Sequence, residues 1–235
     1  MLVLAPMTTE LVPVVRAVTL AREAKGLYRG RRGSNDVIAA LIGIGPARAA
    51  KTTQALLDAH RPARVVVAGV AGGVGADVQV GDLIVPEVVV NAETGTEHLA
   101  TAVGTAQPTG RLVTSDGLLD GQELERLAAS GVVAVDMETA AVAKTCEDVG
   151  CPWMALRGIS DHFLDGLVDD ATMGLVGPDG TPHPHAVARY VARRPTNAMK
   201  LLRLGSGTRA AMKAVTMALV DMLEAEAPGG PEPPD

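Results

Sequence analysis

Three acidic side chains stand where a catalytic carboxylate would be useful. Glu10, Glu138 and Asp161 each follow a stretch that reads as a buried strand. Carboxyl groups are among the side chains that act as general acids and general bases. Each also has an ordinary interpretation, because Glu10 suits the positive end of a helix dipole, Glu138 suits a helix cap and Asp161 suits a turn. Their chemistry therefore depends on whether the fold brings them together.

The elements around these residues alternate between apolar strands and helices. The expected strands are residues 1–5, 36–44, 64–70, 81–91 (a strand pair or one bent strand), 111–114, 132–135 and 152–159. The expected helices are residues 8–25, 46–60, 123–129, 138–149, 186–194 and 208–226. Most strands are apolar throughout, which predicts a central sheet covered on both faces. Ligands bind beyond the carboxyl ends of such strands, where we expect the three carboxylates and a glycine loop at 69–75.

The length of 235 residues fits one large α/β domain or two small ones. We expect a single domain at residues 1–226, and the 47% of hydrophobic residues is enough for its core. Residues 164–185 mix Gly, Asp, Pro and His and read as an excursion from the sheet. Residues 227–235 hold four prolines and two glycines, a composition typical of a disordered tail.

The charge balance favours a small-molecule substrate. Lys plus Arg is 21 and Asp plus Glu is 27, so the formal net charge is −6. Binding to nucleic acid needs clustered cations that neutralise phosphates, and no basic run is longer than two residues. We therefore expect no nucleic-acid partner.

The remaining composition predicts a cytoplasmic protein without a metal or cofactor. Cys146 and Cys151 do not form a CxxC pair and are expected to be reduced thiols. The apolar stretch at residues 1–6 is too short and too uncharged for a signal peptide. The sequence contains no uninterrupted run of about 18 apolar residues, so we expect no membrane span. His162, His183 and His185 are the histidines that could suggest a metal. His183 and His185 lie in an expected loop without a carboxylate or Cys partner at ligand spacing, so we expect no metal site.

Five short segments, in order, resemble the nucleoside phosphorylase/nucleosidase superfamily. Residues 135–143 (VDMETAAVA) are similar to its V-E/D-M-E-x-x-A-I/V-A signature. Residues 156–161 resemble its R-x-I-S-D strand end, and residues 67–82 resemble its glycine loop with a following V-G-D. Residues 42–45 match its G-I-G segment. Residues 5–11 resemble the A-M-E-x-E start of 5′-methylthioadenosine/S-adenosylhomocysteine nucleosidases. The resemblance implies a three-layer α/β/α domain with a mixed, twisted sheet, and a homodimer or larger assembly.

The resemblance also implies roles for individual residues in cutting the bond between a purine and a ribose. Asp161 would protonate the purine at N7, Glu10 would activate the attacking water, and Glu138 would accept hydrogen bonds from the ribose hydroxyls. These are the acid and base that glycosidic hydrolysis requires. The remaining expected substrate contacts are Met137 under the ribose, Ser160 in support of Asp161, and the close-approaching backbone of Gly69, Val70, Ala71 and Gly72.

The sequence departs from the small-substrate nucleosidases in two places. Gly117-Leu118 stands where these enzymes carry a Phe that stacks on the base, so Leu118 takes that position. After Asp161, residues 175–180, 185–190 and 200–204 resemble a branch associated with hopanoid lipid synthesis, whose members are proposed to remove adenine from adenosyl-hopane. Met173, Leu175 and Val176 could line a route for a bulky apolar 5′ group, or could simply pack on the core.

Two other functions remain open at the level of sequence. A phosphorylase would need cations for phosphate, and Arg48 is the best local candidate, although it also reads as a solvated helix charge. The retained Glu10 favours water, because an anionic side chain repels phosphate. A non-catalytic nucleoside-binding relative is the third reading, and the presence of both Glu10 and Asp161 disfavours it.

Overall fold

The computed structural model describes residues 1–101 and 110–225. Its strands are β1 (Leu2–Ala5), β2 (Ala21–Ala24), β3 (Leu27–Arg32), β4 (Asn35–Leu41), β5 (Val65–Gly73), β6 (Leu83–Ile84), β7 (Val88–Asn91), β8 (Glu97–Leu99), β9 (Arg111–Thr114), β10 (Val132–Asp136) and β11 (Trp153–His162). Its helices are α1 (Thr8–Val18), α2 (Pro46–His60), α3 (Gly121–Ala129), α4 (Thr139–Asp148), the 3₁₀ turn η1 (Phe163–Asp165), α5 (Asp170–Met173), α6 (Pro184–Arg193) and α7 (Thr196–Ala225). The predicted tail at 227–235 lies outside the described residues, so the boundary at 226 stays a prediction.

All the strands join one mixed sheet in which β5 is the central strand. The main path runs β2-β3-β4-β1-β5-β10-β9-β7-β8, and β11 pairs with β5 along its whole length. β5 is parallel to β1 at its start and antiparallel to β10 at its end, around Gly72 and Gly73. The long strand β5 thus connects the two halves of the sheet and brings their carboxyl ends to one region.

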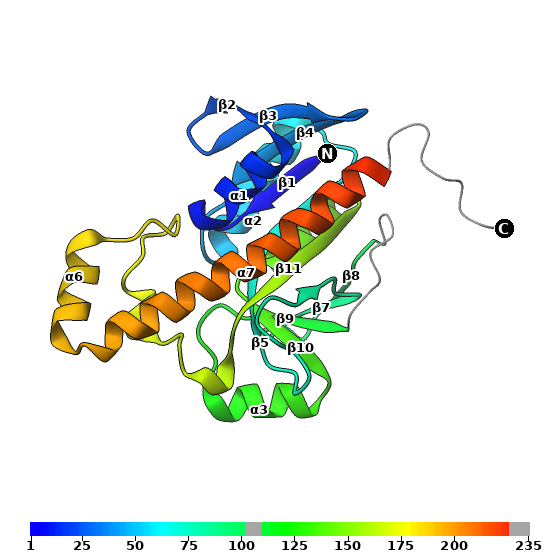
Figure 1. Cartoon of the computed structure of the whole chain (residues 1–235). Coiled ribbons are helices and arrows are strands. Elements are labelled where there is room, and N and C mark those ends of the chain that lie inside the picture. The colour runs from blue at the N-terminus through cyan, green and yellow to red at the C-terminus, as the bar shows by residue number, and fades with distance from the viewer. Residues whose placement is uncertain (102–109, 226–235) are drawn as a thin grey trace.

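Helices cover both faces of this sheet, as the apolar strands predicted. In β1, Leu2 and Leu4 pack toward α2 and α4, whereas Val3 and Ala5 pack toward α1 and α7. Both faces are apolar because the sheet is buried on both sides, and alternation with polar residues would leave unpaired polar groups in a core. Figure 1 shows α7 running across one face. The three-layer α/β/α architecture is therefore confirmed.

Several expected boundaries were wrong. The first helix ends at Val18, because Thr19 adopts a left-handed conformation (φ 62°) and caps it. Residues 21–24, expected in that helix, instead form β2 of the β2–β3 hairpin at the sheet edge. The expected glycine loop is the second half of β5, since both β10 and β11 pair with it.

The last helix begins at Thr196, twelve residues before the expected start. Gly205 and Gly207 both lie inside this helix, and Gly207 is needed for packing. A Cβ on Gly207 would lie 1.9 Å from the carbonyl oxygen of Ser160, and one on Gly158 would lie 2.4 Å from that of Ala211. The bare glycines let α7 touch β11 directly beside the end that carries Asp161. No helix in the described ranges is long and apolar enough to cross a membrane.

We predict that Gly207→Ala lowers the free energy of unfolding by about 1–3 kcal/mol, the usual cost of overpacking a close contact. The matched control is Gly205→Ala in the same helix, where a Cβ would meet nothing within 4 Å. That change should raise stability by about 0.5–1 kcal/mol through helix propensity. Urea unfolding of both variants measures the difference, and equal effects would contradict the packing argument.

Candidate active site

A cavity of about 510 Å³ opens at the carboxyl ends of β1, β5, β10 and β11. The carboxylates Glu10, Glu138 and Asp161 all line it, although they come from three separate segments of the chain. Each is buried, with exposed fractions of 1%, 5% and 7%. The sheet thus brings together the three acids that sequence analysis singled out.

Glu10 is held in one orientation by the backbone. It lies in the first turn of α1, and its two carboxylate oxygens each accept a hydrogen bond at 2.7 Å, from the amide nitrogens of Met7 and Val70. Burial raises the pKa of Glu10 to about 7, although nearby Arg157 and these two amides act in the opposite direction. A carboxyl group with a pKa near neutrality can exchange a proton at physiological pH.

A buried ion pair lies beneath Glu10 and Glu138. The guanidinium of Arg157, fully buried in β11, is 2.5 Å from the carboxylate of Asp136 and 3.8 Å from that of Glu138. Thr139 accepts hydrogen bonds from Arg157 and donates one to Asp136. The single cation therefore faces several carboxylates, and desolvation together with Asp136 raises the pKa of Glu138.

The backbone amide of Gly45 fixes the other side of Glu138, with a 2.9 Å hydrogen bond to its Oε1. Gly45 adopts φ 92°, a conformation that favours glycine, just before α2. The G-I-G segment at residues 43–45 thus serves to orient a carboxylate.

Asp161 sits at an irregularity of β11. The pairing of β11 with β5 shifts between Ile159 and Asp161, so Ser160 is the extra residue of a bulge. Ser160 donates a hydrogen bond of 2.6 Å from its hydroxyl to Asp161 Oδ1. Burial raises the pKa of Asp161, although this hydrogen bond opposes the shift. The expectation that Ser160 supports Asp161 agrees with this contact, but both residues lie inside the strand and not after it.

The expected substrate contacts divide into two groups. Those that line the cavity are Met137, Glu138, Val70, Ala71, Gly72 and Leu118. Gly69 and Ser160 do not line it. A Cβ on Gly69 would lie 2.4 Å from Arg157 Nη1 and 2.5 Å from Glu10 Oε1, so Gly69 makes room for the carboxylate cluster and not for the ligand.

Sequence reasoning missed two features of the cavity. Arg157 received no role, although an arginine inside a wholly apolar strand was a signal, because a buried arginine must be paired. Phe163, the single Phe of the chain, lines the cavity from η1, whereas sequence analysis noted only that Leu118 replaces the stacking Phe of the small-substrate nucleosidases.

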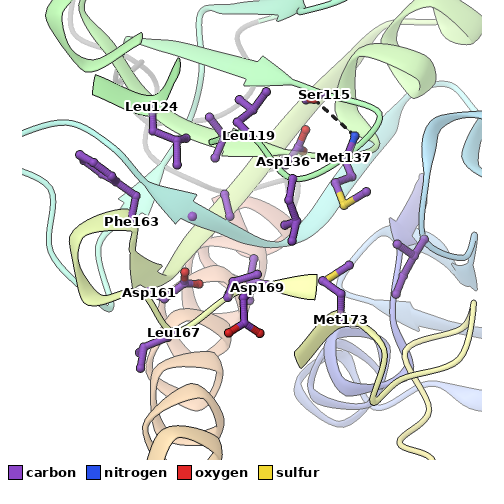
Figure 2. Close-up of a pocket in the computed structure, with 18 of the residues that line it drawn as sticks. Ser115, Leu119, Leu124, Asp136, Met137, Asp161, Phe163, Leu167, Asp169 and Met173 are labelled. Atoms are coloured by element: carbon purple, nitrogen blue, oxygen red, sulfur yellow. Dashed lines mark hydrogen bonds between the residues drawn. The ribbon is translucent and has the colours of Figure 1, made fainter. Parts of the chain in front are cut away.

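The cavity has an apolar character around its acids. In the view of Figure 2, Leu124, Phe163 and Leu167 lie on the side of Asp161, and Met137 and Met173 lie on the opposite side. Val176 also lines the cavity, as expected for a route to bulky groups, but Leu175 is buried and does not.

Cations are absent from the described lining of this cavity, which contains neither Lys nor Arg. Arg48, the sequence candidate for phosphate binding, is exposed on α2, and its aliphatic stem occupies the space beside Gly43. His162 lines the cavity, and its Nε2 lies 3.1 Å from the carbonyl oxygen of Gly75. Within residues 1–101 and 110–225, no group of three His, Cys, Asp or Glu is arranged to hold a metal ion.

We predict that Arg157→Gln destabilises the protein by about 3–5 kcal/mol, because the buried Asp136 loses its partner. The double variant Arg157→Gln/Asp136→Asn should recover most of this loss, since it removes both charges. Thermal and urea unfolding measure both variants. Additive losses in the double variant would contradict a paired buried charge.

Comparison with known proteins agrees with this geometry. The family model described as "Phosphorylase superfamily" matches residues 1–114 and 95–193. A 5′-methylthioadenosine/S-adenosylhomocysteine nucleosidase from Chromohalobacter salexigens is 30% identical over 167 residues, which cover 57% of this chain and 70% of the relative.

Two solved structures share the fold. The nucleosidase of the same name from Neisseria meningitidis, in complex with methylthio-immucillin-A, superposes with a TM-score of 0.70 at 17% identity, covering 95% of this chain and 98% of that one. Futalosine hydrolase from Helicobacter pylori gives a TM-score of 0.68 at 17% identity, covering 95% and 96%. This chain belongs to the phosphorylase superfamily, among proteins that resemble the 5′-methylthioadenosine/S-adenosylhomocysteine nucleosidases.

Proposed function

We propose that this protein is a purine nucleosidase that hydrolyses the N-glycosidic bond of a 5′-modified adenine nucleoside and releases the free base. The observation that carries the proposal is the meeting of three buried carboxyl groups, each with different partners, in one cavity without Lys or Arg in its described lining. The named nucleosidase relatives support the reaction class.

Asp161 serves as the general acid. A purine leaves easily only when its ring nitrogen is protonated as the bond breaks, so the acid must hold a proton until then. Burial raises the pKa of Asp161 and favours that neutral form. The Ser160 hydroxyl, which donates to Asp161 Oδ1, leaves Oδ2 to carry the proton toward N7 of the purine.

Glu10 serves as the base for water, and Glu138 binds the ribose. Both oxygens of Glu10 are aimed by backbone amides, and each keeps a lone pair for a water molecule. As the ribose approaches an oxocarbenium ion, the negative charge of the cluster stabilises it. Glu138 accepts from the ribose hydroxyls, and Met137 packs against the sugar.

The charge of the cavity favours hydrolysis over phosphorolysis. The lining acids include Glu10, Glu138, Asp161 and Asp169, and no lining Lys or Arg was found in the described ranges. The nearby Arg157 is already paired with Asp136. A phosphate anion would be repelled here, whereas a neutral water molecule would not.

The apolar side of the cavity supports a large 5′ substituent. Met173 and Val176 come from the segment after β11 that differs from the small-substrate enzymes. A long apolar 5′ group would fit there, as in an adenosyl lipid of hopanoid synthesis.

We further propose that the protein is a cytoplasmic homodimer. Its two free cysteines support the cytoplasmic location, and its family membership supports the dimer.

Asp161→Asn should lower kcat by about 10²–10⁴-fold while the fold stays intact, because an amide has the shape of the acid but cannot supply the proton. Release of free adenine from 5′-methylthioadenosine measures the loss, and unfolding curves check the fold. Near-normal turnover would remove Asp161 from the role of acid.

Glu10→Gln should abolish hydrolysis and spare the binding of a nucleoside analogue. In the parent protein, kcat/KM should fall below an apparent pKa near 7, because the base is lost as Glu10 takes up a proton. Assays with and without phosphate separate the alternatives. Turnover that survives in the variant and depends on phosphate would establish a phosphorylase.

A series of 5′-alkyl adenosines tests the substrate class. If an apolar route receives the 5′ group, kcat/KM should rise with chain length, by up to about 0.8 kcal/mol for each buried methylene. Met173→Asp, in the cavity lining, should remove the dependence of kcat/KM on chain length. The control Leu175→Met, at a buried residue outside the lining, should keep it. If kcat/KM stays constant or falls with chain length in the parent protein, the proposal of a large 5′ substituent is wrong and the protein is a small-substrate nucleosidase.

A further inference from the structure

Residues 181–220 carry an unusual charge imbalance. This segment contains no Asp or Glu, although the chain as a whole has a net charge of −6. Its cations are Arg189, Arg193, Arg194, Lys200, Arg203, Arg209 and Lys213. One of them, Lys200, is paired with Asp169 at 2.5 Å. A concentrated basic segment in an acidic protein indicates a surface for an anionic partner.

The exposed residues of α7 fall on one face of the helix. Between positions 199 and 217 they are Met199, Leu202, Arg203, Ser206, Arg209, Ala210, Lys213 and Met217. They follow one another at spacings of one, three or four, which keeps them on a single stripe. At 1.5 Å per residue, this α7 stripe is about 27 Å long.

The α7 stripe mixes cations with large apolar side chains. Met199, Leu202 and Met217 are 58%, 65% and 56% exposed. In the described part of the chain, the side chains of Arg203 and Arg209 have no hydrogen bond or ion pair. Met199 and Leu202 lie together near the start of α7, and Met217 lies about 22 Å further along the stripe. Exposed apolar groups that alternate with basic residues on one helix face are typical of helices that lie on membrane surfaces.

We propose that the α7 stripe docks this protein on an anionic lipid surface. The lipid headgroups would pair with Arg203, Arg209 and Lys213, and Met199 and Leu202 would enter the boundary between headgroups and acyl chains. A nucleic acid fits less well, because single strands are bound on aromatic rings and the stripe has none. The proposal rests on the surface alone and not on the proposed substrate.

The α7 stripe begins close to the wall of the cavity. The α6–α7 elbow stands out from the body of the molecule (Figure 1). The Lys200–Asp169 ion pair joins the start of α7 to a residue of the cavity wall. A protein held by this stripe would therefore present its cavity close to the lipid surface.

Vesicle sedimentation with the full chain tests the proposal. We expect binding to phosphatidylcholine vesicles that contain 30% phosphatidylglycerol, little binding to phosphatidylcholine alone, and loss of binding in 0.5 M salt. Each Lys or Arg near such a surface contributes about fivefold, so Arg203→Glu/Arg209→Glu/Lys213→Glu should weaken binding by about 100-fold or more. Met199→Ser/Leu202→Ser should weaken it by about tenfold or more.

The matched control reverses three exposed cations elsewhere, in Arg16→Glu/Arg22→Glu/Lys51→Glu, and should bind as the parent protein does. Thermal unfolding checks every variant, so the result does not depend on enzymatic activity. Equal weakening by the control would reduce the effect to net charge and overturn the proposal. It would also be overturned if no vesicles bind, if a single-stranded nucleic acid binds more tightly, or if Met199→Ser/Leu202→Ser converts a dimer to a monomer in sedimentation velocity.

Discussion

The buried guanidinium of Arg157 is the charge on which the site depends. Several carboxylates approach it within a dry part of the sheet, and without a cation they would repel one another. Asp136 takes the close contact, so Glu10 and Glu138 feel only part of the attraction while they bear the full effect of burial. The same cation thus allows the cluster to fold and leaves two acids with raised pKa values at the cavity.

Close backbone packing is the second requirement. Gly69 leaves room for Glu10 and Arg157 beside β5, and Gly207 lets α7 rest on the backbone of Ser160. Because these glycines have no side chain, neighbouring groups can come close to the backbone: Glu10 and Arg157 at Gly69, and Ser160 at Gly207. Neither glycine lines the cavity, so the role of both is structural, although Gly69 lies in the matched glycine segment.

Much of the fold and three acids of the site followed from sequence because they depend on local pattern. Apolar strands, with acidic residues near or just after their ends, place Glu10, Glu138 and Asp161 at one end of a sheet. The role of Arg157 did not follow, because its partners are distant in sequence and meet only in the folded sheet. The start of α7 was also missed, since the use of Gly207 depends on a neighbouring strand and not on helix propensity.

The length of α7 has a consequence for how a ligand enters. This helix of 30 residues runs from the outer elbow to the far side of the sheet and is fixed against β11 at its middle. A rod held in this way cannot swing to admit a substrate. The segment between β11 and α6 closes the other side of the cavity, and backbone hydrogen bonds from Thr8 and Ile44 to Asp179 and Pro178 attach its far end. These hydrogen bonds lie beside the backbone amides of Met7 and Gly45, which orient Glu10 and Glu138, so the position of this segment is coupled to the position of the two acids.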